Sequence, residues 1–364
     1  MLNAFSARVK SAIIDIPKFD TLLMEEFSFL ARSLSTFLVV SMGFGDRPNI
    51  LILAGGGGHT GFAYSLAQRL EKEANLIFLV PYGDTLSYKR LIKFGEVNYL
   101  LKSRGPKTSI CHFAVNILRA FTSSMKKVKG KIDFVVSTGS NFCIPPALVG
   151  FLKGFRLINI EAAIRFTKPS QTARILQPFS TITALQWDEQ KTMLKGTLVG
   201  PLLPKPEIQP WKGDYILVTG GSFGYKLLFD IVNLSKIENV VLQTGMVDPK
   251  PYINQHPEWK IMQSSPMFQE LLAGAEVVVT HFGSTALEAL AYKKPTILVH
   301  NPEWKHNAGR MDAEIFAKKV GAKFISEMNL EHLMDAIECA PMQNNRIPTY
   351  GDGTKVLANM ILNL

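Results

Sequence analysis

The sequence predicts an α/β protein of two similar domains, each built on a parallel β-sheet covered by helices. From residue 47 onward, short apolar runs alternate with helix-like stretches, which is the pattern of parallel sheets. A strand, a glycine loop and a helix open each half, near residues 49–72 and again from residue 214. Between the halves, residues 201–210 contain four prolines, which indicates a stiff, extended linker between domains.

These observations fix the expected organisation of the chain. We expect a membrane-associating helical segment at residues 1–46, a first domain at 47–203, a linker at 204–213, a second domain at 214–345 and a C-terminal helix at 346–364. Strands are expected at residues 49–54, 76–80, 132–137, 156–160, 214–219, 240–243, 277–280 and 296–299. The longest apolar run of the N-terminal segment, residues 33–45, is shorter than the roughly 20 residues that span a bilayer. A helix in the membrane interface or packed on its own domain is favoured over a single span.

The charge of the chain indicates which partners it could bind, and its cysteine content indicates its cellular compartment. The chain has 40 Lys and Arg against 30 Asp and Glu, a formal net charge of +10, which favours polyanions. Since no nucleic-acid-binding motif is present, an anionic membrane surface or a phosphorylated substrate is expected instead. The three cysteines are scattered, without CxxC spacing, which excludes a disulfide scaffold and suits a reducing compartment.

The first glycine loop leads into a helix through Gly57, Gly58, His59 and Thr60. Glycines allow a ligand close to the backbone, and the free N–H groups of a helix N-terminus attract an anion. The helix dipole should lower the pKa of His59, so that a neutral imidazole could accept a proton.

The same loop also fits a different function. Gly56-x-Gly58-x-x-Gly61 satisfies the dinucleotide fingerprint, and Asp84 follows the second strand as a possible ribose ligand. A nucleotide-dependent oxidoreductase is therefore an alternative prediction.

In the second half, a glycine loop and a strand end carry the candidate ligands for a nucleotide diphosphate. Gly221, Ser222 and Gly224 follow the first strand, and Ser222 could bind a phosphate. Further along, a strand ends at His281, the chain turns at Gly283, and Ser284 or Thr285 begins a helix. Glu288, one turn into that helix, is placed where a ribose diol would follow the diphosphate.

A second group of candidates lies in the first half. Glu161 ends a strand, where parallel sheets form their sites, and Arg165 and Ser170 follow in a basic segment suited to phosphate. No DxD, HExxH, P-loop or G-x-S-x-G motif is present, so metal-first and acyl-transfer mechanisms are not favoured.

Taken together, these stretches resemble the GT-B glycosyltransferases that use UDP-GlcNAc. GGGGHT, VVSTGSNFCIPPA, INIEAAIRFTKPSQTARILQPF and the Gln186–Trp187 pair are similar to the membrane-linked subunit of the eukaryotic enzyme that adds the second GlcNAc to dolichol-diphosphate-GlcNAc. HFGSTALEALAYKKP resembles that enzyme's catalytic subunit and, more distantly, the bacterial transferase that forms lipid II. The chain looks like both subunits fused, an arrangement associated with archaeal homologues.

The resemblance implies a GT-B fold, with two Rossmann-like domains facing a central cleft. It implies an inverting transferase that moves GlcNAc from UDP-GlcNAc to a polyprenyl-diphosphate-linked GlcNAc, forming a β-1,4 chitobiose unit on the cytoplasmic face of a membrane. Neither a metal nor another cofactor is expected, because helix N-termini can hold a diphosphate. A homo-oligomer is possible, and a non-catalytic binding subunit is a further alternative.

The resemblance also implies roles for the candidate residues. His59 or Glu161 would be the catalytic base, and sequence alone does not choose between them. Acceptor phosphates would contact Gly57, Gly58, Thr60, Arg165 and Ser170. The donor would contact Gly221, Ser222, Gly224, His281, Gly283, Ser284, Thr285, Glu288 and Arg310. Arg310 stands where the family often has a Gln that contacts the sugar, which leaves a UDP-hexose other than UDP-GlcNAc open.

Overall fold

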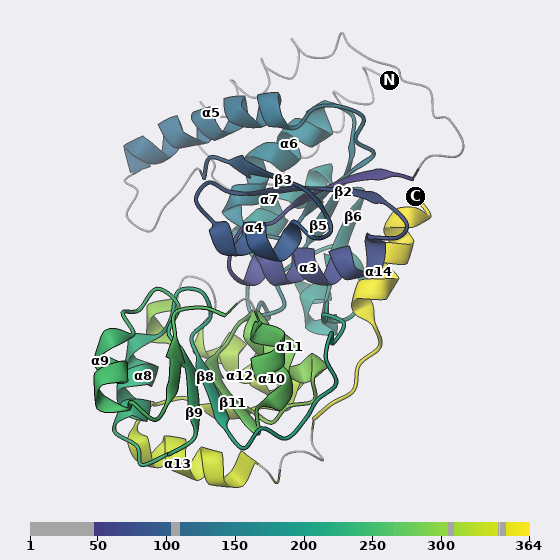
Figure 1. Cartoon of the computed structure of the whole chain (residues 1–364). Helices are drawn as coiled ribbons and strands as arrows, with labels where there is room; N and C mark the ends of the chain where they lie inside the picture. Colours follow the sequence, from purple (N-terminus) through teal and green to yellow (C-terminus); the bar gives the residue numbers. More distant parts are fainter. Residues whose placement is uncertain (1–46, 103–109, 266, 305–308, 341, 343–346) are drawn as a thin grey trace.

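The computed structural model describes residues 47–102, 110–265, 267–304, 309–340, 342 and 347–364. The N-terminal segment expected at residues 1–46 lies outside this part of the chain. The remainder forms two α/β domains that lie one above the other in Figure 1.

The first domain contains a sheet of seven parallel strands among the described residues, in the order β3-β2-β1-β4-β5-β6-β7. Its elements are β1 (Asn49–Leu53), α3 (Gly58–Leu70), β2 (Asn75–Pro81), α4 (Thr85–Leu91), β3 (Gly95–Leu100), α5 (Ile110–Lys127), β4 (Phe134–Ser137), η1 (Asn141–Cys143), α6 (Ile144–Leu152), β5 (Arg156–Ile160), α7 (Gln171–Leu176), η2 (Gln177–Phe179), β6 (Ile182–Leu185), η3 (Asp188–Thr192) and β7 (Thr197–Leu198).

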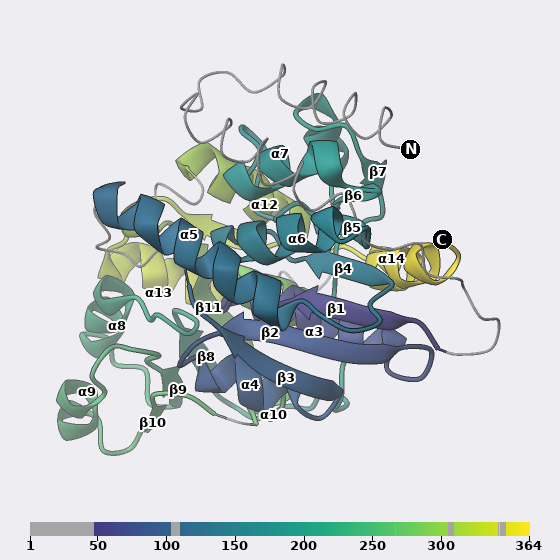
Figure 2. The same ribbon diagram turned by 90° about the horizontal axis from the view of Figure 1, so that it is seen from above.

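Strand β1 illustrates why this sheet is buried on both faces. Ile50 and Ile52 pack in the same hydrophobic cluster as α3, whereas Leu51 and Leu53 pack in the cluster that contains α5 and α6. Alternate side chains of a strand point to opposite faces, so a strand that is apolar at every position needs helices on both sides. Figure 2 shows α5 and α6 lying across one side of the sheet.

The second domain repeats this plan with six parallel strands in its described part, ordered β10-β9-β8-β11-β12-β13. Its elements are β8 (Ile216–Thr219), α8 (Lys226–Asn233), β9 (Val240–Gln243), α9 (Lys250–Gln255), β10 (Lys260–Met262), α10 (Phe268–Gly274), β11 (Val277–His281), α11 (Ser284–Ala291), β12 (Thr296–Val299), η4 (Pro302–Trp304), α12 (Arg310–Val320), β13 (Lys323–Ile325) and α13 (Leu330–Cys339). After α13 the chain returns to the first domain, where α14 (Gly353–Leu362) packs beside α3.

Each sheet reverses its strand order at one point, between β1 and β4 in the first and between β8 and β11 in the second. Open α/β sheets bind ligands at the carboxyl ends of the strands that flank such a reversal. Both glycine loops and the strand end at His281 therefore lie where this fold places a site.

At α3 the two domains are joined by a common hydrophobic core. One hydrophobic cluster joins Phe62 and Leu66 of α3 to Phe282, Leu287 and Leu290 of the second domain. Among the described residues, no helix is both long enough and apolar enough to cross a membrane.

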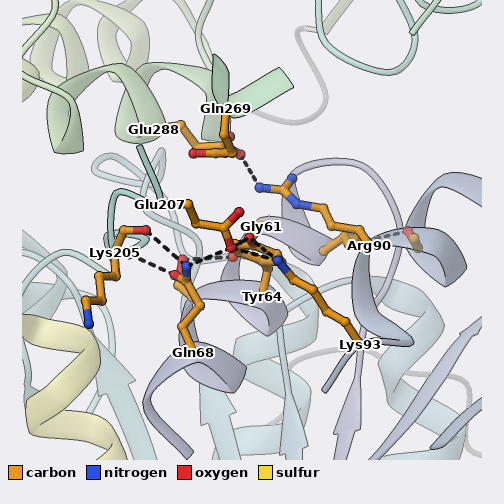
Figure 3. A network of polar contacts seen from close by, with 12 residues as sticks. Gly61, Tyr64, Gln68, Arg90, Lys93, Lys205, Glu207, Gln269 and Glu288 are labelled. Atoms are coloured by element: carbon orange, nitrogen blue, oxygen red, sulfur yellow. Dashed lines mark hydrogen bonds and ion pairs between the residues drawn. The ribbon is translucent and has the colours of Figure 1, made fainter. Parts of the chain in front are cut away.

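A polar network joins the linker to the first domain (Figure 3). Glu207 of the linker accepts hydrogen bonds from Tyr64 of α3 and from Lys93, whose Nζ lies 2.7 Å from its carboxylate. Lys205 donates its backbone N–H to the side chain of Gln68 at 2.8 Å. The path of the chain between the domains is thus fixed by side chains on one face of the first domain.

Candidate functional site

His59 lies near the start of α3, after the first glycine loop (residues 55–58), and faces the carboxyl end of β4. Its Nδ1 is 2.6 Å from the carbonyl oxygen of Thr138. Because a carbonyl only accepts, Nδ1 carries the proton and donates it, which leaves Nε2 as the acceptor.

The surroundings of His59 keep its imidazole neutral. Burial lowers the pKa of His59 below its usual 6.5, and the positive charges of Lys102 and Arg165 act in the same direction, while the Thr138 carbonyl opposes them. The sequence predicts this direction from the helix dipole, but the main cause in the structure is burial. A neutral histidine of fixed tautomer is therefore present at the first switch point.

Glu161 is fully buried, and backbone N–H groups occupy both of its oxygens. Oε1 accepts from Ala162 N at 2.6 Å and Oε2 accepts from Ser170 N at 2.8 Å. Burial raises the pKa of Glu161, and these two hydrogen bonds oppose that rise. The carboxylate thus joins the two ends of the segment that we call the Arg165 loop, residues 161–170.

The carbonyl groups of the Arg165 loop are held by side chains that follow β6. Gln186 donates to the Glu161 carbonyl at 2.8 Å, and Trp187 donates to that of Ala163 at 2.7 Å. Gln190 donates to the carbonyls of Ala162 and Arg165, at 2.9 and 3.1 Å. Sequence reasoning identified the Gln186–Trp187 pair only by resemblance and missed Gln190, which has no local signal beyond its place in a short polar turn.

From the other domain, Asp312 of α12 also binds the Arg165 loop. Its Oδ1 accepts from the backbone N–H groups of Phe166 and Thr167 at 2.9 and 2.8 Å. Sequence reasoning missed Asp312, because an acidic residue in the first turn of a helix usually only complements the helix dipole.

The second glycine loop (residues 220–224) turns through positive φ angles at Gly221 (66°) and Gly224 (78°). A Cβ at Gly224 would lie 2.2 Å from the Thr244 carbonyl oxygen, so only glycine fits there. Ser222 is exposed in this turn. It does not begin a helix, because α8 starts only at Lys226.

His281 lies buried behind the second glycine loop, 4.0 Å from a Cβ built at Gly221. Its Nδ1 is 3.1 Å from the side-chain amide of Asn301, and its ring packs edge-on against Trp304. Burial lowers the pKa of His281 to about 4. His281 is therefore a neutral support for the loop.

Two helix N-termini meet between the domains. Gly283 precedes α11 and Gly57 precedes α3, and neither helix has a side-chain cap. Cβ atoms built at Gly58 and Gly61 would lie 3.3 Å from Ser284 Oγ and Ser284 Cβ, respectively. At the start of α3, the N–H groups of His59 and Thr60 donate to the carbonyl oxygens of Gly56 and Gly57, at 3.3 and 3.1 Å. Each N-terminus carries a partial positive charge. Their meeting point, with Ser284 and Thr285 half-buried beside it, is suited to bind an anion.

Glu288 of α11 is buried at the same domain boundary and faces α4 (Figure 3). Its Oε1 accepts from Arg90 of the first domain at 3.1 Å, and its Oε2 accepts from Gln269 at 2.9 Å. Sequence reasoning located the carboxylate but not its partner Arg90. Nearby on the first domain, Lys93 forms a separate ion pair with Glu207.

Several expected ligands have other partners in the structure. Thr60 Oγ1 is buried 2.6 Å from Ser87 Oγ, and Ser170 Oγ caps α7 by accepting from Ala173 N. Asp84, the expected ribose ligand of the dinucleotide alternative, accepts from Ser87 N and Ser87 Oγ as the N-cap of α4. We therefore leave these residues out of the candidate site. Arg310 begins α12 and is exposed.

Comparisons with known proteins match the two halves of the chain to two different families. Residues 50–201 match the family described as "Oligosaccharide biosynthesis protein Alg14 like", and residues 215–352 match the "Glycosyltransferase family 28 C-terminal domain".

Two of the similar proteins are UDP-N-acetylglucosamine--N-acetylmuramyl-(pentapeptide) pyrophosphoryl-undecaprenol N-acetylglucosamine transferases. The one from Trichodesmium erythraeum is 26% identical, over 78% of this chain and 81% of the relative. The one from Prochlorococcus marinus (strain MIT 9215) is 29% identical, over 78% of this chain and 84% of the relative.

Solved structures give the same fold. MurG of Acinetobacter baumannii matches with a TM-score of 0.61 at 17% identity, covering 88% of this chain and all (100%) of that one. UDP-GlcNAc 2-epimerase of Neisseria meningitidis matches with a TM-score of 0.59 at 12% identity, covering 87% and 100%. The predicted GT-B architecture is confirmed, with the family 28 match confined to the second half of the chain.

The buried, neutral His281 predicts a loss of stability in acid. Below pH 6.5 the unfolded chain takes up a proton at this position, but the folded chain does so only near pH 4, so the free energy of unfolding falls as the pH drops through this interval. The full shift corresponds to about 3 kcal/mol. We expect the urea midpoint of His281→Asn to fall less between pH 7 and pH 4.5 than that of the wild type. The exposed His332 supplies the control His332→Ala, and equal pH dependence in wild type and His281→Asn would contradict the assignment.

Proposed function

We propose that this chain is an inverting GlcNAc transferase. It moves GlcNAc from UDP-GlcNAc to a polyprenyl-diphosphate-linked GlcNAc and so forms a β-1,4-linked chitobiose unit. The observation that carries the proposal is the meeting of the uncapped N-termini of α3 and α11 between the two switch points. One N-terminus comes from each domain, which suits a reaction in which donor and acceptor both bear diphosphates.

The names of the relatives support the substrate classes. The curated relatives transfer N-acetylglucosamine from its UDP form to an acceptor joined to undecaprenol through a pyrophosphoryl group. The Alg14-like match of the first domain suggests an acceptor used in oligosaccharide biosynthesis. We assign the acceptor to the first domain and the UDP-sugar to the second.

His59 is the catalytic base in this proposal. Its Nε2 removes the proton from the acceptor hydroxyl as the hydroxyl oxygen attacks the anomeric carbon of the donor sugar. The bond from that carbon to the UDP oxygen breaks, and UDP leaves with the electron pair. His59 is preferred over Glu161 because Nε2 is its acceptor, whereas both Glu161 oxygens already accept backbone hydrogen bonds.

The leaving diphosphate is stabilised by the protein itself in this proposal. Its negative charge lies at the start of α11, against the N–H groups of the helix N-terminus and the second glycine loop, and neither a metal nor another cofactor takes part. The ribose diol binds Glu288 in place of Arg90, because the Glu288 carboxylate already accepts from two donors.

The membrane contact is assigned to the first domain. Leu118 and Arg119 are exposed on α5, and Leu101 and Lys102 are exposed after β3. Apolar side chains next to cations suit the surface of an anionic membrane. The enzyme would lie on the cytoplasmic face, with the N-terminal segment at residues 1–46 as a further contact.

The assay of the proposed function uses the lone chain, a synthetic polyprenyl-diphosphate-GlcNAc and a panel of UDP-sugars, with mass spectrometry of the lipid. We expect one added HexNAc from UDP-GlcNAc, in EDTA as well as with Mg²⁺. A hexose added from UDP-glucose would correct the donor, and rescue by Mg²⁺ after loss in EDTA would contradict the metal-free mechanism. Absence of product together with tight NAD binding would favour the oxidoreductase alternative.

His59→Ala should lower kcat by about 10²–10⁴, the usual contribution of a general base, without changing the affinity for UDP. Wild-type turnover should fall on the acid side with a midpoint below 6.5, because the neutral imidazole is the active form. Steady-state kinetics and calorimetry with UDP measure both effects, with His332→Ala as the control. Near-normal turnover of His59→Ala would exclude it as the base.

Glu288 and Arg90 should have opposite effects on donor binding. Glu288→Ala should weaken UDP binding by about ten- to hundredfold, because a charge-assisted hydrogen bond to the ribose is lost. Arg90→Ala should strengthen it by up to about fivefold, because the guanidinium that competes for Glu288 is gone. Lys93→Ala, which removes a nearby cation that pairs with Glu207 instead, should leave UDP affinity unchanged. Weaker UDP binding in Arg90→Ala would argue that Arg90 contacts the donor directly.

A further inference from the structure

Asp312 lies in the second domain, but most of its hydrogen bonds are to the first domain. It is only 3% exposed. Its carboxylate accepts from the N–H groups of Phe166 and Thr167 and, at 3.1 Å, from Thr167 Oγ1. Three donors of the Arg165 loop thus converge on one buried carboxylate from across the domain boundary.

The same carboxylate also holds the start of its own helix. Its Oδ2 accepts from Gly309 N at 3.2 Å, directly before Arg310, the first residue of α12. Capping α12 requires only this hydrogen bond from Gly309 N. The contacts with the Arg165 loop go beyond capping, and they join the loop to the end of α12 where the donor sugar is expected.

The rest of the Arg165 loop cannot move independently of its own domain. Its carbonyl groups are held by Gln186, Trp187 and Gln190, and Glu161 joins its two ends. A shift of α12 must therefore either carry the first domain with it or break the hydrogen bonds to Asp312. Breaking them leaves a buried carboxylate that has lost its three donors from the loop and keeps the bond from Gly309 N. This loss is costly, so the contact favours one relative placement of loop and helix.

This placement matters for the charges around His59. Arg165, within the loop, acts electrostatically on His59, Glu161 and Asp312. We infer that Asp312 is a positioning residue: it ties the acceptor-side Arg165 loop to donor-side helix α12 and so sets the position of Arg165 and His59 relative to the donor. This inference rests on the proposed function, because it assigns the loop to the acceptor and α12 to the donor.

The contact itself is tested by hydrogen exchange of the ligand-free chain, read by mass spectrometry on peptides covering residues 163–170. Asp312→Ala should speed exchange of the Phe166 and Thr167 amides by about tenfold or more. The matched control is Glu314→Ala on the same helix, whose partner is Lys318, and it should leave these amides at the wild-type rate. Unchanged exchange in Asp312→Ala would overturn the inference.

The positioning role is tested by kinetics on the same variants. Asp312→Ala should lower kcat by about ten- to hundredfold, the effect of a misplaced catalytic group, while the affinity for UDP stays within twofold of the wild type. Asp312→Asn keeps an oxygen for Phe166 and Thr167 and should recover most of the rate. A normal kcat despite fast exchange, or a loss that appears only as weaker UDP binding, would overturn the positioning role.

Two further outcomes are separable. If Asp312→Ala does not fold, Thr167→Ala is the substitute, because it removes one donor from the loop side and leaves the cap of α12 intact. Thr167→Ala should show a smaller change in the same direction in both amide exchange and kcat. No change in either measurement would overturn the inference. If the wild-type chain transfers no sugar, the proposed function fails and the positioning role fails with it, whereas the exchange data still decide whether Asp312 holds the loop.

Discussion

The close contact between α3 and α11 is the constraint on which the rest of the structure depends. Gly58 and Gly61 favour it, because a Cβ at either position would lie 3.3 Å from Ser284, closer than an ordinary van der Waals contact. Through it, the switch points of two separate sheets face the same small volume, each supplying an uncapped helix N-terminus. Two partial positive charges brought together disfavour an empty site and favour one that holds an anion. The glycines and the net positive charge therefore both favour an anion at this place, which supports the proposed diphosphate chemistry.

Several buried polar side chains hold the short Arg165 loop. Glu161, Gln186 and Gln190 from its own domain and Asp312 from the other are all buried, and each is hydrogen-bonded to the loop. Buried polar groups contribute little net stability, because desolvation offsets much of each hydrogen bond. They do fix a single conformation. A loop held in this way can keep a cation in place beside His59 without rearrangement during the reaction.

Local sequence predicted the two-domain parallel architecture, whereas the roles of the site residues stay predictions. The apolar run at residues 49–54 became β1 (Asn49–Leu53), and the helix expected near Thr60 begins two residues earlier at Gly58. Strands such as β3 (Gly95–Leu100) were missed, because the segment is partly polar and starts with glycine. The partners of the site residues were not predictable, since Asp312 meets Thr167 across 145 positions and Arg90 meets Glu288 across 198. Such contacts depend on how the domains pack, which no local pattern records.

We expect the donor diphosphate to lie at the start of α11, close to the N-terminus of α3. A crystal structure of the full chain with UDP would show whether it does. We expect the diphosphate between the second glycine loop and the start of α11, the ribose on Glu288, and Arg90 separated from that carboxylate. UDP bound instead along the first glycine loop, with its ribose at Asp84 and the Arg90–Glu288 ion pair intact, would contradict it.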